Sequence, residues 1–181
     1  SNSGFFFRNN LWILIPNYKN KMSKNDRNEF NNVDFIEIFP GKEKKLYLYD
    51  EESIIGFGWT HDLNNVGVWT EGKEANIIFK FRNHETKDYK LKFKIKSVIT
   101  NNTDKLNMRI MINGELTKKL TFDRFTNQDN QFIDITVKKE NLKNEIHKVD
   151  FIIKNPISPV SLFESPDGRD LGILVESIKI N

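Results

Sequence analysis

Hydrophobic and polar residues alternate along most of the chain from Val33 onward. Between positions 90 and 96, Leu91, Phe93 and Ile95 alternate with four lysines. A period of two is typical of a β-strand with one face in a core and the other in water. The same alternation recurs in three later segments, 106–112, 133–137 and 149–153. We expect ten of these apolar side chains to share one core: Leu91, Phe93, Ile95, Met108, Ile110, Ile112, Ile133, Ile135, Phe151 and Ile153.

Turn signals lie between the alternating segments. Asn113 and Gly114 separate the apolar run IMI from the run ELTKKLTF. They predict a hairpin with a type I′ turn, because both central residues of that turn must accept positive φ. In the last segment the apolar phase slips between Val175 and Ile178, which predicts a β-bulge there.

The chain as a whole predicts an all-β fold. Only Lys138–Ile146 has helical character, enough for one or two turns, and further turns are expected at 101–104 and 127–130. Short strands with one polar face, without an internal repeat or a βαβ alternation, indicate an antiparallel β-sandwich of jelly-roll type. With 181 residues, 15 of them Phe, the chain is long enough to bury the core of one such domain, which we expect at 33–181.

Residues 1–32 lack this alternation and are expected to form an N-terminal arm or linker. Ser1 and Asn2 resemble the scar of a removed purification tag, and the start without Met suggests an excised fragment. The segment Leu11–Ile15 favours an edge strand of the main domain, with a partner-binding segment as the alternative. The wider run FFFRNNLWILIP is too short, and too interrupted by Arg8, to span a bilayer, so no membrane insertion is expected.

Composition and motif content argue against several functional classes. The chain has no cysteine, which rules out disulfides, thiolate catalysis and cysteine-ligated metal. His61, His84 and His147 lack the spacing of a metal site and are expected to be solvated or structural. No nucleophile elbow or P-loop occurs, so we expect no catalytic residue, no cofactor and no metal other than a structural calcium ion on turn oxygens. The formal net charge of +3 gives no support for nucleic-acid binding.

Two tryptophans are the strongest candidates for a binding site. Trp59 and Trp69 lie among glycines just before a strongly β-patterned run. An indole can plug the core of a sandwich, and it is also the side chain that stacks best on the face of a sugar. The sequence leaves both roles open, one indole in the core or one reaching a ligand groove.

The motif SPDGR, just before the last strand, predicts a tight turn. Asp167 is expected to accept local hydrogen bonds, and Gly168 is free to take positive φ. Arg169 can pair with Asp167 or with a buried carbonyl, or it can face the anionic or hydroxyl groups of a ligand.

A comb of four lysines occupies one face of a single predicted strand: Lys90, Lys92, Lys94 and Lys96. Charges that face solvent in this way discourage aggregation through sheet edges. The alternative is a shallow anion-binding face for an acidic glycan or a phospholipid surface. Aromatic interleaving is weak, since Phe93 points the opposite way, which disfavours single-stranded nucleic acid.

Two blocks of the chain carry a family resemblance. Their matching positions are Gly58-Trp59, Gly67, Trp69-Thr70, Gly72 and Ala75, then Asn155-Pro156, Ser158-Pro159, Ser165, Asp167, Arg169, Leu171-Gly172 and Ser177-Ile178. Over about Leu46 to Asn181, the chain resembles the non-catalytic C-terminal β-sandwich domain, similar to a carbohydrate-binding module, of bacterial surface-polysaccharide glycosyltransferases and phosphoglycerol transferases. One departure is that the family pattern has a Glu before the second glycine-tryptophan unit, where this chain has only Asp62 and Asn64.

The resemblance implies an accessory, glycan-binding domain of a capsule or surface-polysaccharide biosynthesis enzyme. Its expected partners are a glycan or surface polysaccharide and the catalytic domain of the same protein. Its expected location is a bacterium, in the cytoplasm or at the membrane rather than in the periplasm. The predicted ligand site consists of Trp59, Trp69, Asp167 and Arg169, gathered near one end of the sandwich. The alternative is a structural or protein-docking module that binds no sugar.

Overall fold

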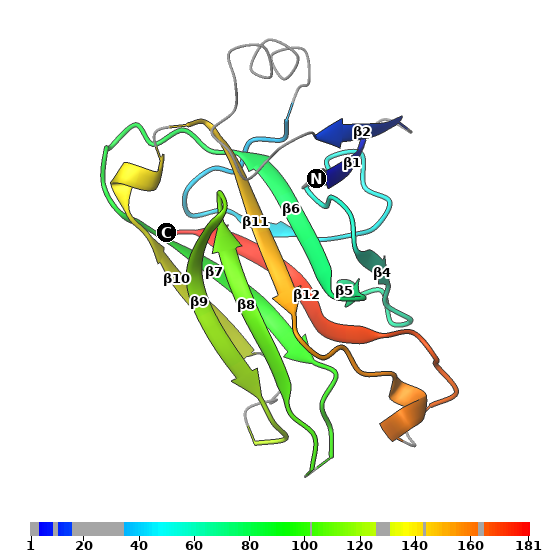
Figure 1. Ribbon diagram of the computed structural model, residues 1–181. Coiled ribbons are helices and arrows are strands. Elements are labelled where there is room, and N and C mark those ends of the chain that lie inside the picture. The colour runs from blue at the N-terminus through cyan, green and yellow to red at the C-terminus, as the bar shows by residue number, and fades with distance from the viewer. Residues whose placement is uncertain are drawn as a thin grey trace.

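The computed structural model describes residues 4–8, 11–15, 35–101, 103–125, 131–142, 144–162 and 165–181. Two antiparallel sheets pack face to face (Figure 1). The four-stranded sheet has the order β6 (Glu74–Lys80), β11 (Ile146–Ile153), β8 (Leu106–Ile112) and β9 (Glu115–Phe122). This arrangement confirms the predicted all-β, jelly-roll-like antiparallel sandwich.

The six-stranded sheet lies behind the four-stranded sheet in Figure 1. Its order is β10 (Gln131–Val137), β7 (Tyr89–Ser97), β12 (Leu171–Ile180), β5 (Val68–Glu71) and β4 (Trp59–His61). The short strand β3 (Glu43–Lys45) pairs with the second half of β12, on the same edge that β5 occupies along the first half. The sheet therefore has β12 at its centre, with β7 along its whole other side.

The core lies between the two sheets, where the alternation placed it. All ten predicted core side chains are buried, none exposing more than 4% of its surface. Phe93 and Phe151, from opposite sheets, meet edge to face with ring centroids 5.4 Å apart. Aromatic pairs favour this geometry because the positive edge of one ring meets the negative face of the other.

The hairpin between β8 and β9 has the predicted two-residue type I′ turn. Asn113 has φ 51° and Gly114 has φ 84°, and Ile112 pairs directly with Glu115. The Asn113 side chain reaches across to β11, where Oδ1 accepts a hydrogen bond from the Lys148 amide at 2.9 Å. The turn is thus tied to the next strand of its sheet as well as to its own hairpin.

The predicted bulge in β12 is also confirmed, because the register with β7 shifts between Val175 and Ser177. Glu176 is the residue left out of the ladder, and its carboxylate lies 2.6 Å from the ammonium group of Lys94. A bulge adds one residue to one strand and re-aims its neighbours. Here it allows Val175 and Ile178 both to point into the core.

The segment Leu11–Ile15 forms strand β2, but it pairs with β1 (Gly4–Arg8) in a separate two-stranded sheet. The prediction of an edge strand in the main domain was therefore wrong about its partner, because Gly4–Arg8 provides a local one. The helical stretch is a single 3-10 turn, η1 (Lys139–Leu142), and a second, η2 (Pro159–Leu162), precedes β12. The rest of the arm at 1–32 and the turn at 127–130 lie outside the described residues.

His147 is the one histidine in the core. It exposes 2% of its surface, and its Nδ1 accepts a hydrogen bond from Asn113 Nδ2 at 3.0 Å. Because Asn113 Oδ1 is already bonded to the Lys148 amide, the amide orientation is fixed and the His147 proton belongs on Nε2. Burial lowers the pKa of His147 to about 4, although the carbonyl groups of Phe81 and Asn144 partly offset this effect. The ring is therefore neutral at pH 7.

An ion pair is buried on β11, on the strand face that looks away from the core. The Lys148 ammonium lies 3.0 Å from Asp150 Oδ1, and both side chains are less than 10% exposed. Burial raises the pKa of the Asp150 carboxyl, and the charge of Lys148 opposes this shift. The Asp150 carboxylate therefore depends on the neighbouring Lys148 ammonium to offset the cost of its burial.

Candidate functional site

The hairpin of β4 and β5 carries both tryptophans, and its register decides where they point. Trp59 is paired with Thr70, and Thr60 is paired with Trp69. Directly paired residues of antiparallel strands share a face, and successive residues alternate. Trp59 and Trp69 therefore lie on opposite faces of the six-stranded sheet.

Trp59 points between the sheets. Its ring meets Phe151 edge to face with a centroid distance of 5.7 Å, and its Nε1 donates to the Asn76 carbonyl on β6 at 2.6 Å. The preceding Gly58 has φ +82°, and a Cβ there would lie 2.0 Å from the Glu74 carbonyl oxygen. Only glycine allows β6 to approach this closely. Trp59 thus closes the side of the core between the two sheets.

Trp69 is half-buried on the outer face of the same sheet. Its Nε1 donates to Asp62 Oδ1 at 3.1 Å, while Asp62 Oδ2 accepts the Val66 amide, also at 3.1 Å. The carboxylate of Asp62 therefore fixes both the indole and the β4–β5 loop. Leu63 and Val66 in this loop are 79% and 48% exposed, which is unusual for apolar side chains so close together.

Asp62 was not among the predicted site residues. A signal for it existed, since the family resemblance has a carboxylate at about this place and Asp62 is the acidic residue available. The Asp62 carboxylate reaches the indole N–H because the loop at 62–66 turns back over its own first residue.

Arg169 joins the turn before β12 to β4. Its Nε and Nη2 donate to the carboxylate of Asp167, with Nη2 to Oδ2 at 2.5 Å. Its Nη1 donates to Thr60 Oγ1 at 3.0 Å and to the His61 carbonyl at 2.8 Å. These hydrogen bonds from the guanidinium lower the pKa of Asp167 to about 2 and raise that of Arg169. Both side chains are therefore ionised at pH 7.

The turn itself differs from the prediction in one respect. Asp167 is the expected local acceptor, since its Oδ1 accepts the Arg169 amide at 3.0 Å. Gly168, however, is not among the residues with positive φ. The turn is closed by the Asp167 side chain, which replaces the backbone reversal that a left-handed glycine would provide.

The predicted site residues are therefore only partly brought together. Arg169, Asp167 and Trp69 lie on the outer side of the β4–β5 hairpin, since Thr60 pairs with Trp69 and accepts from Arg169. Trp59 faces the other way, into the sandwich. The negative charges of Glu71 and Asp62 both act on Arg169, so the outer corner carries more carboxylates than cations. Such a corner suits ligands that bring hydroxyl donors.

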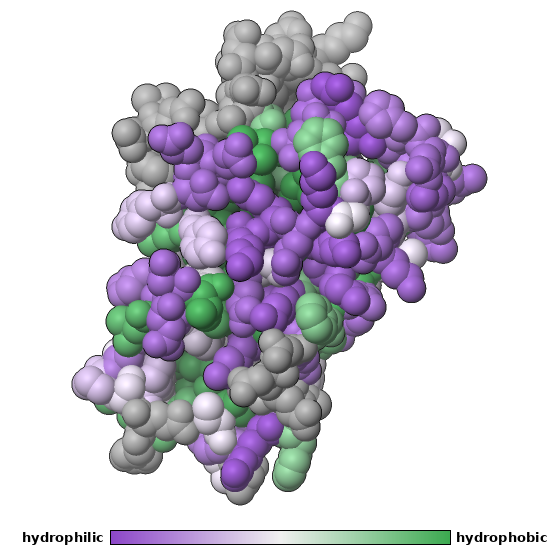
Figure 2. All heavy atoms as spheres, turned by 180° about the vertical axis from the view of Figure 1, so that it is seen from behind, coloured by the Kyte–Doolittle hydropathy of each residue, from purple (hydrophilic) through white to green (hydrophobic). Residues whose placement is uncertain are grey.

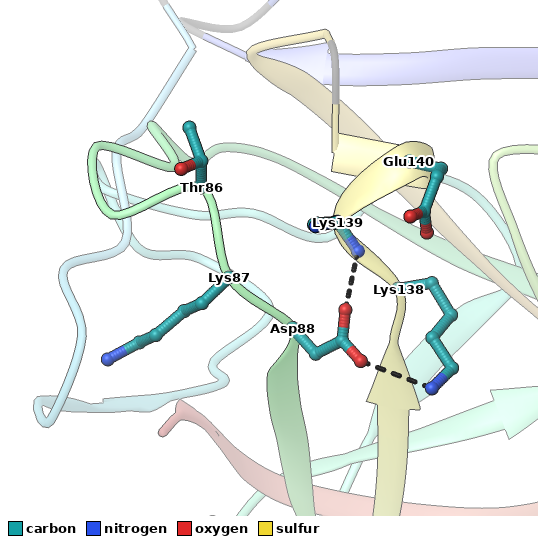
Figure 3. A pocket seen from close by; sticks show the side chains of 6 residues that line it. All are labelled: Thr86, Lys87, Asp88, Lys138, Lys139 and Glu140. Carbon is teal, nitrogen blue, oxygen red and sulfur yellow. Dashed lines mark hydrogen bonds and ion pairs between the residues drawn. The ribbon is translucent and has the colours of Figure 1, made fainter.

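A hollow lies at the opposite edge of the six-stranded sheet, where η1 meets the start of β7 (Figure 3). Asp88 occupies its centre and accepts the Lys139 amide at 2.9 Å and the Lys138 ammonium at 3.1 Å. These bonds lower the pKa of Asp88. The hollow is wide open to solvent, and these two bonds tie η1 to the start of β7.

Among the described residues, no group of three or more His, Asp or Glu side chains is placed to hold a metal ion. Within those residues there is also no helix with the length and apolar character needed to cross a bilayer.

No protein-family model matches the chain, and no curated protein is similar to it in sequence. Several solved structures do match, at low sequence identity. The CBM36-1 domain of a multidomain xylanase from the hindgut metagenome of Trinervitermes trinervoides is 14% identical, with a TM-score of 0.44, over 77% of this chain and 97% of that one. A family 35 carbohydrate binding module from an environmental isolate is 14% identical, with a TM-score of 0.44, over 75% and 93%.

A third similar structure is the cycloisomaltooligosaccharide glucanotransferase of a Paenibacillus species. It is 11% identical, with a TM-score of 0.44, over 77% of this chain and 18% of that enzyme. Identities and scores this low carry no inference about what this chain binds, because one fold hosts many functions.

Proposed function

We propose that this domain binds a glycan on the outer face of its six-stranded sheet, with Trp69 as the stacking platform. The observation that carries the proposal is the placement of Trp69: it is half-buried on that face, and Asp62 holds its Nε1. An indole fixed in this way can stack on a sugar ring without losing side-chain freedom when the sugar binds. Immobilisation before binding is typical of a platform.

Asp167 and Arg169 form the wall of this site. The guanidinium donates through Nε, Nη1 and Nη2 to protein acceptors, so its first task is to hold the turn against β4. Each oxygen of the Asp62 carboxylate accepts one hydrogen bond from the protein, which leaves lone pairs for sugar hydroxyls, whereas the Asp167 carboxylate is occupied by Arg169. Trp59 lies outside the proposed site, because its ring is packed against Phe151. Weak binding is expected, since a shallow and wet surface immobilises little apolar area.

We further propose that the domain is an accessory part of a bacterial enzyme that assembles a capsule or another surface polysaccharide. The support is the residue pattern shared with domains of glycosyltransferases and phosphoglycerol transferases, from Gly58 to Ala75 and from Asn155 to Ile178. The segment itself would retain the polymer near a separate catalytic domain. The sequence of the complete gene product tests this context: a different kind of enzyme beside the domain would refute it.

A structural or protein-docking role is the second candidate. It is favoured by the internal bonds of Arg169, which resemble a clamp between the last turn and β4. Under this alternative, the outer corner stabilises the fold and no sugar is retained.

A glycan array with matched variants distinguishes the two roles. Trp69→Ala should abolish retention of whichever glycan the parent domain binds, while the thermal midpoint falls only slightly. Trp69→Phe, which keeps most of the apolar packing, should weaken retention and preserve the midpoint. Tyr49→Ala is the control, since this ring is 89% exposed in the loop after β3 and lies outside the proposed site.

Two results would overturn the proposal. One is a parent domain that retains no glycan on the array. The other is full retention by a folded Trp69→Ala variant. Unfolding of both Trp69→Ala and Arg169→Ala, without glycan retention by the parent, would favour the structural role.

A further inference from the structure

The outer face of the six-stranded sheet carries lysines on three of its strands, β7, β12 and β3. In the pairing of β7 with β10, Lys90 lies opposite Thr136, Lys92 opposite Asp134 and Lys94 opposite Phe132. On the other side of β7, Lys92 lies opposite Lys179 of β12. On β10, β7, β12 and β3, which we call the lysine face, the outward charged residues are six lysines and three carboxylates: Lys45, Lys90, Lys92, Lys94, Lys96 and Lys179, with Glu43, Asp134 and Glu176. Figure 2 looks onto this side of the molecule, where hydrophilic side chains dominate and hydrophobic ones are scattered among them.

The positive charge on this lysine face is only partly neutralised. Lys94 is paired with Glu176, and the Lys92 ammonium lies 5.1 Å from the centre of the Phe132 ring. Lys45, Lys90 and Lys179 form no ion pair with any described residue. The whole chain has a formal net charge of only +3, so the lysine face carries an excess as large as that of the entire molecule. Concentrated charge of one sign attracts ligands of the other sign.

The lysine face is continuous with the proposed sugar platform. Trp69 is paired with Leu174, and Leu174 is paired with Lys96. Since neighbouring strands are about 4.8 Å apart, the backbone of Lys96 lies about 10 Å from that of Trp69 across the sheet. On the far side of the comb, Phe132 is 53% exposed. One surface therefore has an aromatic ring toward each edge and lysines between them.

Building on the proposed function, we propose that the ligand is an acidic polysaccharide, bound along the outer face from Trp69 to the lysine comb. A polymer rather than a single sugar fits because the two aromatic rings stand three strand intervals apart, about 15 Å. At the corner around Trp69, Asp62 can accept hydrogen bonds from hydroxyl donors, and its negative charge repels anions. The lysines, by contrast, attract carboxylate or phosphate groups. Only a polymer with both hydroxyl-rich and anionic groups can bind the corner around Trp69 and the lysines together.

Affinity electrophoresis tests this inference with acidic and neutral polymers. Polygalacturonate, alginate and hyaluronate are the acidic probes, while dextran, xylan and fully methyl-esterified polygalacturonate are the neutral ones. At least one acidic polymer should be retained more strongly than the neutral probes. Retention should fall when sodium chloride is raised to about 0.5 M, because salt at that level screens exposed charges within a few ångströms.

Matched variants assign the effect to the lysine face. The triple variant Lys92→Gln, Lys94→Gln and Lys96→Gln should weaken retention of the acidic polymer about tenfold or more, since exposed charges each contribute a fraction of the binding free energy. The control is Lys105→Gln, Lys119→Gln and Lys139→Gln, which removes the same charge from exposed positions elsewhere. It should bind almost as well as the parent.

The outcomes separate the two proposals. In one outcome, the parent and the triple lysine variant retain neutral polymers equally, and Trp69→Ala loses this retention. The proposed function then stands, but the proposal of an acidic ligand is overturned. The acidic-ligand proposal is also overturned if retention depends on the lysine comb, is unchanged in Trp69→Ala and extends to phosphatidylglycerol vesicles. The lysine face would then be a general polyanion or membrane surface. Retention of no polymer at all overturns both.

Discussion

Lowering the pH from 7 to 4 should destabilise the folded domain through the buried ring of His147. The pKa of this ring is about 4 in the folded domain, against 6.5 for an unperturbed histidine. Burial disfavours the imidazolium, so between these two values the unfolded chain binds a proton that the folded chain does not. Stability is therefore complete above pH 6.5 and declines as the pH falls toward 4.

The size of the effect follows from the shift. A difference of one pKa unit corresponds to about 1.4 kcal/mol, so the shift of His147 should remove about 3 kcal/mol of unfolding free energy between pH 7 and pH 4. Domains of this kind have about 5–15 kcal/mol in total, which makes this loss easy to measure. Carboxylates also titrate in this range, so the total change with pH is not the test.

The test is a comparison of variants by urea unfolding at several pH values from 4 to 8. His147→Gln removes the titrating ring but keeps an oxygen that can accept from Asn113 Nδ2. Its stability should fall by about 3 kcal/mol less than that of the parent over the same range. His84→Gln, a change at an exposed ring, should follow the parent. If the curves of the parent and His147→Gln run parallel from pH 7 to pH 4, the ring is not held neutral by burial and the reasoning is wrong.

Three further substitutions test the packing and the buried charges by chemical denaturation at pH 7. Phe151→Ala should cost about 3–5 kcal/mol, because it empties the space between the sheets, and a loss below 1 kcal/mol would contradict that packing. Gly58→Ala should cost clearly more than Gly72→Ala: both positions have positive φ, a strain of about 1–2 kcal/mol, but only Gly58 has a carbonyl oxygen in the way. Lys148→Ala should cost about 3–5 kcal/mol by leaving Asp150 buried without its counter-ion, and a variant as stable as the parent would show that the carboxylate is hydrated.

Much of the fold could be predicted from local pattern alone. Alternation fixed the inward face of β7, β8, β10 and β11, the Asn113–Gly114 pair set one hairpin, and a phase slip revealed the bulge at Glu176. His147 shares the phase of Val149 and Phe151, so its burial was also within reach of the same reasoning. These features depend on residues close together in the sequence, so the pattern of apolar and polar positions predicts them.

The outer corner could not be predicted in the same way. Trp59 and Trp69 are ten positions apart, which would place them on one face of a continuous strand, but the loop at 62–67 resets the register and puts them on opposite faces. Arg169 bonds to Thr60 across 109 positions of sequence, a contact that only the assembled sheet creates. The buried pair on β11 lies on the strand face that its pattern assigns to water. Each of these depends on how distant segments meet.

The turn at Asn113 and Gly114 also affects how the domain ages chemically. In an Asn-Gly sequence the glycine nitrogen readily attacks the asparagine side chain, expelling ammonia to form a succinimide that water opens to aspartate or isoaspartate. In the folded domain this side chain is tied to β11 through the Lys148 amide and His147, so it is held back from that reaction. Deamidation should then accumulate in proportion to the unfolded fraction, which mass spectrometry can follow. A chain whose Asn113 is deamidated while unfolded would refold with a carboxylate in place of the amide that donates to His147. Each unfolding event would therefore add to the fraction of chains that lack this hydrogen bond.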